Sequence, residues 1–193
     1  VGKYSSIALD SSDIPHISYY EGDEYDLKYA TNKSGVWECD IIDGNPKGIS
    51  VFGINLGLMG LTTNVSAGKY SSIAIDSQDC PRISYFAEED ESIRVAVYSQ
   101  GDEMTTTVGW RVEAIEKGDV GEHSALALDG QDGMHISYND YAAGSLKYAV
   151  SEDGSTLVEI SSIEAEAGFR QVVLSWETAS EIDSAGFNVY RAA

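Results

Sequence analysis

Cysteine, proline and basic side chains are all scarce in this chain of 193 residues. Two cysteines are too few for a disulfide framework, and Cys39 and Cys80 lack the spacing of metal ligands. Only 12 lysines and arginines stand against 32 aspartates and glutamates, which gives a net charge of −20. Because nucleic-acid binding depends on basic side chains that neutralise phosphates, we expect no nucleic-acid partner. The acidity leaves divalent cations and neutral ligands as candidate partners.

The sequence also lacks long hydrophobic runs and familiar catalytic motifs. No stretch of about 18 apolar residues is present, so we expect no membrane span. There is no G-x-S-x-G, no H-E-x-x-H and no glycine-rich phosphate loop. The few arginines are spread along the chain, whereas a sialidase-like enzyme needs a convergent set of them. We therefore predict a protein that is not an enzyme, with a sialidase- or lyase-like activity as the less favoured alternative.

One stretch of sequence occurs three times. Residues 4–20 read YSSIALDSSDIPHISYY, residues 70–86 match them at 12 of 17 positions, and residues 123–139 match at 9 of 17. Small residues alternate with large ones in each copy, which is the period of a β-strand, and turn residues follow. A further strand carries L-K-Y-A at 27–30 and again at 146–149. Each copy therefore predicts a four-stranded antiparallel meander.

A strand with small residues on one face and large residues on the other suits a sheet packed between two like sheets. Repeated four-stranded meanders stacked in this way make a β-propeller. We therefore predict an all-β fold of about three propeller-type blades, with a β-solenoid or a tandem sandwich as the alternative. The predicted blades span 1–45, 67–118 and 119–156, the last with an uncertain fourth strand, and 46–66 is an apolar, glycine-rich insertion.

Two resemblances add to this interpretation. Residues 172–191 (VVLSWETASEIDSAGFNVYR) resemble the opening strands of the fibronectin type III-like modules found near the C-termini of secreted bacterial proteins. We therefore assign a partial module of that kind to 157–193. The repeats, with S-x-A-x-D at 6–10, P-H-I-S-Y at 15–19 and L-K-Y-A at 27–30, resemble a family of secreted or surface bacterial propeller repeats. That resemblance implies a propeller and an extracellular or cell-surface location, and it transfers no catalytic residue.

Acidic residues recur at two turn positions of every copy. These candidate calcium ligands are Asp10, Asp13, Asp76, Asp79, Asp129 and Asp132. Paired carboxylates on a tight turn are able to hold Ca²⁺. Since each copy needs the same turn, the favoured interpretation is that they accept backbone N–H groups. We predict no other cofactor.

The repeats, the acidity and the missing motifs favour a non-enzymatic structural or interaction module, such as a subunit of an adhesin or filament. Three blades fall short of the usual four to eight or so, so open edges should associate with further copies or with the remainder of a longer chain. A lectin-like propeller that binds glycans is the alternative. The candidate interface and ligand residues are Phe52, Leu56, Leu58 and Met59 in the insertion, and the tyrosines Tyr20, Tyr25 and Tyr141, which we expect to be exposed.

Overall fold

A computed structural model describes residues 2–44, 49–51, 54–56, 66–101, 109–152, 156–168 and 171–178. Within these residues the fold is all-β and every strand pairing is antiparallel, as the sequence predicts. In that part of the chain no helix has the length and apolar character needed to cross a bilayer.

The first two copies of the repeat form two four-stranded meanders. The first sheet contains β1 (Lys3–Leu9), β2 (Pro15–Glu21), β3 (Asp26–Thr31) and β4 (Glu38–Asp43), in that order. The second sheet contains β7 (Ala67–Ile75), β8 (Pro81–Ala87), β9 (Ser92–Ser99) and β10 (Gly109–Lys117), also in chain order. Between them, β5 (Ile49–Val51) and β6 (Ile54–Leu56) pair as a separate hairpin.

The third sheet has five strands instead of four. It contains β11 (Ala125–Leu128), β12 (Met134–Asp140), β13 (Ser145–Glu152), β14 (Thr156–Gly168) and β15 (Gln171–Thr178). The fourth strand, which the sequence left undefined, is the start of β14, which pairs with β13 over 156–160 and then with β15. The predicted boundary between 156 and 157 therefore falls inside one strand. Residues 172–178, the start of the stretch that resembles fibronectin type III-like strands, lie in β15 and extend the third sheet.

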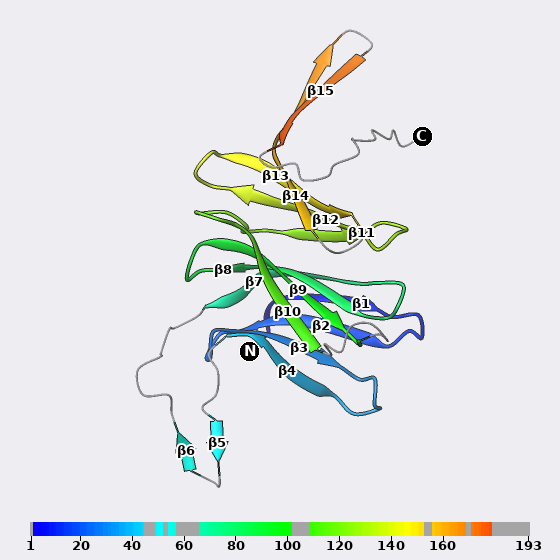
Figure 1. Cartoon of the computed structure of the whole chain (residues 1–193), viewed down its shortest axis with the longest axis vertical. Coiled ribbons are helices and arrows are strands. Elements are labelled where there is room, and N and C mark those ends of the chain that lie inside the picture. The colour runs from blue at the N-terminus through cyan, green and yellow to red at the C-terminus, as the bar shows by residue number, and fades with distance from the viewer. Residues whose placement is uncertain are drawn as a thin grey trace.

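The three sheets lie in chain order along the long axis of the molecule, blue, green and yellow in Figure 1. The core between the first and second sheets includes Leu27, Ile73 and Tyr85, and that between the second and third includes Ile93 and Ile136. At the first junction the small residue Ala8 of the first sheet packs on the core that contains Ile73 of the second sheet. The alternation of small and large residues is therefore used for packing between sheets.

Both junctions are joined by the same hydrogen bonds at equivalent positions. The backbone N–H and hydroxyl of Ser11 donate to the carboxylate of Asp79, at 2.8 and 2.7 Å. One sheet further on, Ser77 donates in the same way to Asp132, at 2.9 and 2.5 Å. The turn of each later sheet thus accepts hydrogen bonds from the turn of the sheet before it.

An aromatic column crosses the stack at the start of each copy. The rings of Tyr4 and Tyr70 lie 4.5 Å apart, and those of Tyr70 and His123 lie 4.3 Å apart. The hydroxyl of Ser71 donates to the Tyr4 carbonyl at 2.8 Å, and that of Ser124 donates to the Tyr70 carbonyl at 3.1 Å. The recurring residues thus make equivalent contacts at both junctions between neighbouring sheets.

Ion pairs also link the first and second sheets. Arg94 of β9 contacts Asp43 of β4 and Asp90 of its own sheet, both at 2.9 Å. Burial raises the pKa of Asp90, but hydrogen bonds from Lys117, Ser92 and Arg94 outweigh it and lower the pKa to about 2. Arg94 therefore pairs with acids across the junction and within its own sheet.

Candidate functional site

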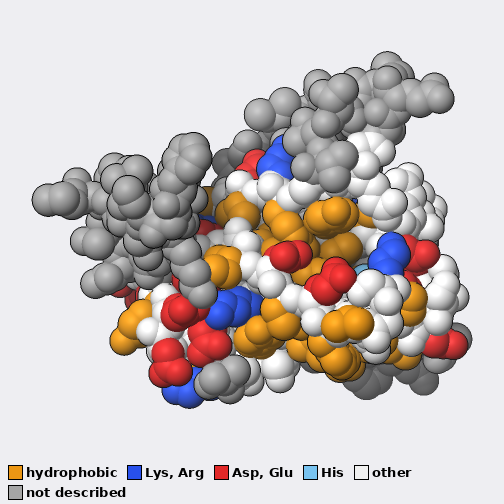
Figure 2. All heavy atoms as spheres, turned by 90° about the horizontal axis from the view of Figure 1, so that it is seen from below, with side chains coloured by type: hydrophobic (Ala, Val, Ile, Leu, Met, Phe, Trp, Pro, Cys, Tyr) orange, Lys and Arg blue, Asp and Glu red, His pale blue; other side chains and the backbone are white. Residues whose placement is uncertain are grey.

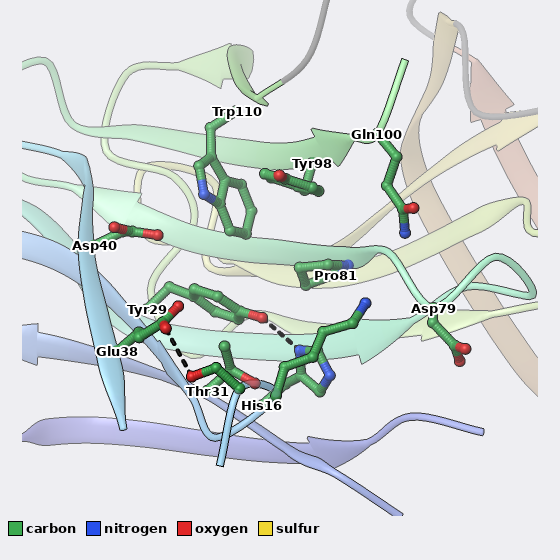
Figure 3. A pocket seen from close by; sticks show the side chains of 12 residues that line it. His16, Tyr29, Thr31, Glu38, Asp40, Asp79, Pro81, Tyr98, Gln100 and Trp110 are labelled. Carbon is green, nitrogen blue, oxygen red and sulfur yellow. Dashed lines mark hydrogen bonds between the residues drawn. The ribbon is translucent and has the colours of Figure 1, made fainter. Parts of the chain in front are cut away.

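A pocket of about 530 Å³ opens between the first and second sheets (Figure 3). The first sheet contributes His16, Tyr29, Thr31, Lys33, Ser34, Glu38 and Asp40, and the second contributes Asp79, Pro81, Tyr98, Gln100 and Trp110. This volume is within the range of about 300–1,000 Å³ that small-molecule sites occupy. The pocket exists because two consecutive sheets meet, so neither sheet forms it alone.

Three aromatic side chains form one wall of the pocket. The ring of Trp110 on β10 meets Tyr29 of the first sheet edge-on at 5.1 Å, and it meets Tyr98 edge-on at 5.3 Å. Edge-to-face contacts of this kind stabilise ring positions beyond the area that they bury. Tyr29 is buried and Trp110 packs against the same core, so the wall is held by the junction itself.

A polar network fixes the floor of the pocket. The hydroxyl of Tyr29 lies 2.5 Å from Nδ1 of His16, and Nε2 of that ring lies 3.4 Å from the Asp10 carboxylate. Burial raises the pKa of Tyr29 to about 12, and the nearby Asp40 carboxylate adds to the shift. Tyr29 is therefore a neutral hydroxyl at ordinary pH and serves as both donor and acceptor.

Acidic side chains outnumber lysine and arginine in the lining of the pocket. Glu38 and Asp40 project from alternate positions of β4, and Asp79 enters from the turn before β8. The backbone N–H and then the hydroxyl of Ser11 lower the pKa of Asp79, so this carboxylate stays ionised. Lys33 is the lysine of the lining. This balance disfavours an anionic ligand and suits a neutral one with hydroxyl groups.

The repeated aspartates are used in turns and junctions. The carboxylates of Asp10, Asp76 and Asp129 each accept two backbone N–H groups of their own turn, at 2.8–2.9 Å. The carboxylates of Asp79 and Asp132 accept hydrogen bonds from the turn of the preceding sheet. The backbones of Asp13, Asp79 and Asp132 all have positive φ. Among the described residues, no three His, Cys, Asp or Glu side chains are grouped as metal ligands. Calcium binding stays a prediction, and Asp10 and Asp79 gain a second role at the pocket.

The remaining predicted ligand residues do not meet at this pocket. Tyr20 is only 4% exposed, because its ring packs beneath Tyr4, so the expectation of an exposed tyrosine there was wrong. Tyr25 and Tyr141 are exposed as expected but lie outside the lining. Phe52, Leu58 and Met59 fall outside the described residues, and of Leu56 only the backbone is described.

Sequence reasoning missed the three aromatic residues as a set. Trp110 and Trp37 occupy equivalent positions in the two sheets, yet Trp110 faces a neighbouring sheet and Trp37 is exposed. The available signal was where the copies differ, since Tyr29 of the first sheet corresponds to Val95 of the second. Only the contact between the sheets shows that Tyr29 lines a pocket there.

The chain matches no protein-family model and no curated protein. Among solved structures it is similar to a fucose lectin from Kordia zhangzhouensis in complex with methyl-fucoside. The identity is 19% and the TM-score 0.47, over 83% of this chain and 99% of the lectin chain.

Proposed function

We propose that this protein is a non-enzymatic carbohydrate-binding module whose pocket between the first and second sheets takes a neutral sugar. The observation that carries the proposal is that one pocket is lined both by the aromatic side chains Tyr29, Tyr98 and Trp110 and by carboxylates. Glu38 and Asp40 lie on β4, where Asp40 is the cross-strand neighbour of Tyr29. A sugar ring has apolar C–H faces and a rim of hydroxyl groups. It needs an aromatic surface and hydrogen-bond acceptors together.

The chemistry of each lining group fits that requirement. Trp110 and Tyr98 offer apolar ring surface with polar edges. The carboxylates of Glu38 and Asp40 accept hydrogen bonds from sugar hydroxyls, and charged acceptors make the stronger ones. Gln100 adds an amide that both donates and accepts.

The proposed architecture is that of propeller blades. Two meanders of four strands and a third that continues into β15, stacked through repeated contacts, support blades of a β-propeller. The resemblance of the repeats supports an extracellular or cell-surface setting. The fibronectin type III-like character of 157–193 rests on sequence resemblance, and β14 and β15 attach that segment to the third sheet.

The test is titration of the full chain with neutral monosaccharides and disaccharides, read by isothermal calorimetry. Trp110→Ala should weaken binding by at least about 2- to 13-fold, since one aromatic contact contributes roughly 0.5–1.5 kcal/mol beyond the area it buries. Tyr141→Ala, which removes an exposed tyrosine outside the pocket, should bind as the parent does.

The outcomes separate the pocket from other sites. Loss of binding in Tyr141→Ala with retention in Trp110→Ala would place the sugar on the exposed tyrosines. Hydrolysis of any bound glycoside would refute the non-enzymatic assignment. Silence of the parent protein across a panel of neutral sugars would refute the proposal itself.

A further inference from the structure

The two ends of the stack carry faces whose repeat equivalents are buried inside it. Ile7 of β1 is 63% exposed, whereas Ile73, at the same position of β7, is 6% exposed. Leu146 of β13 is 65% exposed, whereas Leu27, at the same position of β3, is fully buried. The first sheet has no sheet before it in the described chain, and the third has none after it.

The outer face of the first sheet, which we define by Ile7 and Leu9, has the character of an internal junction. Both side chains alternate with Ala8, which packs on the core behind them, so they point away from the second sheet. Their equivalents Ile73 and Ile75 pack against the first sheet. Figure 2 shows hydrophobic side chains gathered on this end of the molecule.

The outer face of the third sheet, defined by Leu146 and Tyr148, has the complementary character. Its β11 presents the small residues Ala125 and Ala127 beside them, both exposed. The His135 side chain is 36% exposed there, whereas that of His16 is 2% exposed under the second sheet. The first sheet contacts the second through a similar set of residues, namely Leu27, Tyr29 and the small residue Ala8.

We propose that a second copy of this chain docks head to tail, with the outer face of its first sheet on the outer face of the third sheet. In this contact the first sheet of one copy packs on the third sheet of the other in the same orientation as consecutive sheets pack within one chain. Polar groups match in the same way, since Asp13 holds the position of Asp79 and Gly130 holds that of Ser77, whose N–H donates at the internal junction.

Docking also completes a second pocket, a point that rests on the proposed function. His135 and Tyr148 form the same contact as His16 and Tyr29, with rings 5.9 Å apart against 5.8 Å. Trp37 of the docked copy holds the repeat position of Trp110 and would cover this pair.

The number of sheets decides the size of the assembly. Closed propellers have about four to eight blades, and the described part of this chain supplies three sheets of four or five strands. Two copies give six, so a closed pair of chains is expected. Because each chain carries a charge of −20, added salt should strengthen the association by screening repulsion.

Sedimentation velocity of the full chain over a concentration series tests the docking. Leu9→Asp and Leu146→Asp should each raise the dissociation constant by about 30-fold or more, since each places a charge where a Leu is buried. Val36→Asp, at an exposed residue on a turn, is the matched control and should associate as the parent does.

Mixing the two blocked variants distinguishes head-to-tail docking from a face-to-face dimer. Each blocked variant should be monomeric alone, and the mixture should form two-chain complexes through the remaining pair of intact faces. Self-association of Leu146→Asp alone, or a monomeric parent at every concentration, would overturn the docking. Sugar titration gives the second reading: two sites per chain in the dimer are expected, and a dimer with one site per chain would overturn the second pocket.

Discussion

Replacing Tyr85 with phenylalanine removes one hydroxyl between the first and second sheets and leaves the ring in place. Tyr85 is fully buried, and its hydroxyl donates to the Asp43 carboxylate at 2.6 Å. Burial first, and then the charge of Asp43, raises the pKa of Tyr85 far above its ordinary value, so the hydroxyl stays a donor at all working pH. The same carboxylate accepts from Arg94 at 2.9 Å.

The expected cost follows from these contacts. A hydrogen bond to a charged group contributes about 1.5–3 kcal/mol. Because Arg94 keeps the Asp43 charge paired in the variant, the loss should lie near the lower end, about 1.5–2 kcal/mol. For a chain of this size, each kcal/mol lowers the melting temperature by about 2–4 °C, so Tyr85→Phe should melt about 3–8 °C below the parent.

Calorimetry or circular dichroism of the two proteins at one pH measures the shift. Tyr25→Phe, at an exposed tyrosine, is the matched control and should change the melting temperature by less than the error. If Tyr85→Phe melts together with Tyr25→Phe, the hydrogen bond between the sheets contributes nothing. The packing of the two sheets through β4 would then be wrong.

Three further changes test other parts of the stack. Asp79→Ala should lower the melting temperature more than Asp13→Ala, because only the former turn receives hydrogen bonds from a preceding sheet in the described chain. Gly68→Ala should cost about 2–5 kcal/mol by denaturant unfolding, since φ is +108° and a Cβ would lie 2.7 Å from the Leu27 Cα. Asp90→Asn should flatten the acid limb of the stability profile, because its lowered pKa contributes stability above about pH 3.8 that is lost as the pH falls toward about 2.

The sequence was sufficient to predict the meanders because the signals are local. The alternation in YSSIALD and the Asp–Pro turn set strands and register over a few residues, and three copies repeat the evidence. The fourth strand of the third sheet was harder, since 156–160 carries no tryptophan and continues directly into the hairpin with β15. Because β14 pairs with both β13 and β15, the amino-acid composition does not change where the third copy of the repeat ends.

The pocket was beyond local signals because it depends on contacts between residues far apart in the chain. Tyr29 and Trp110 are separated by a whole repeat, and their rings meet only when the sheets stack. The same stacking contributes to the burial of Tyr20, because Lys69 of the second sheet lies over its ring, 5.7 Å from the centroid. Burial between sheets is a property of the pair of sheets, so periodicity in one strand does not specify it.

The second sheet carries other residues at the positions of His16 and Tyr29. At the position of Tyr29 it has Val95, which is buried in the core with Ile136 of the third sheet. Arg82 takes the position of His16 and still reaches the aspartate of its own turn, at 3.2 Å. In the second sheet Arg82 therefore keeps the contact with the turn aspartate. Val95 packs in the core where the first sheet has the tyrosine of its His–Tyr pair.

The third sheet restores the pair that the second has replaced. His135 and Tyr148 are in hydrogen-bond contact, although the structure shows no sheet beyond them in the described residues. The pair is unnecessary for the turn, since Arg82 makes the equivalent contact in the second sheet without a tyrosine. A pair that lines a pocket in the first sheet thus recurs on the exposed face of the third. That recurrence gives both the proposed sugar site and the head-to-tail docking the same structural origin.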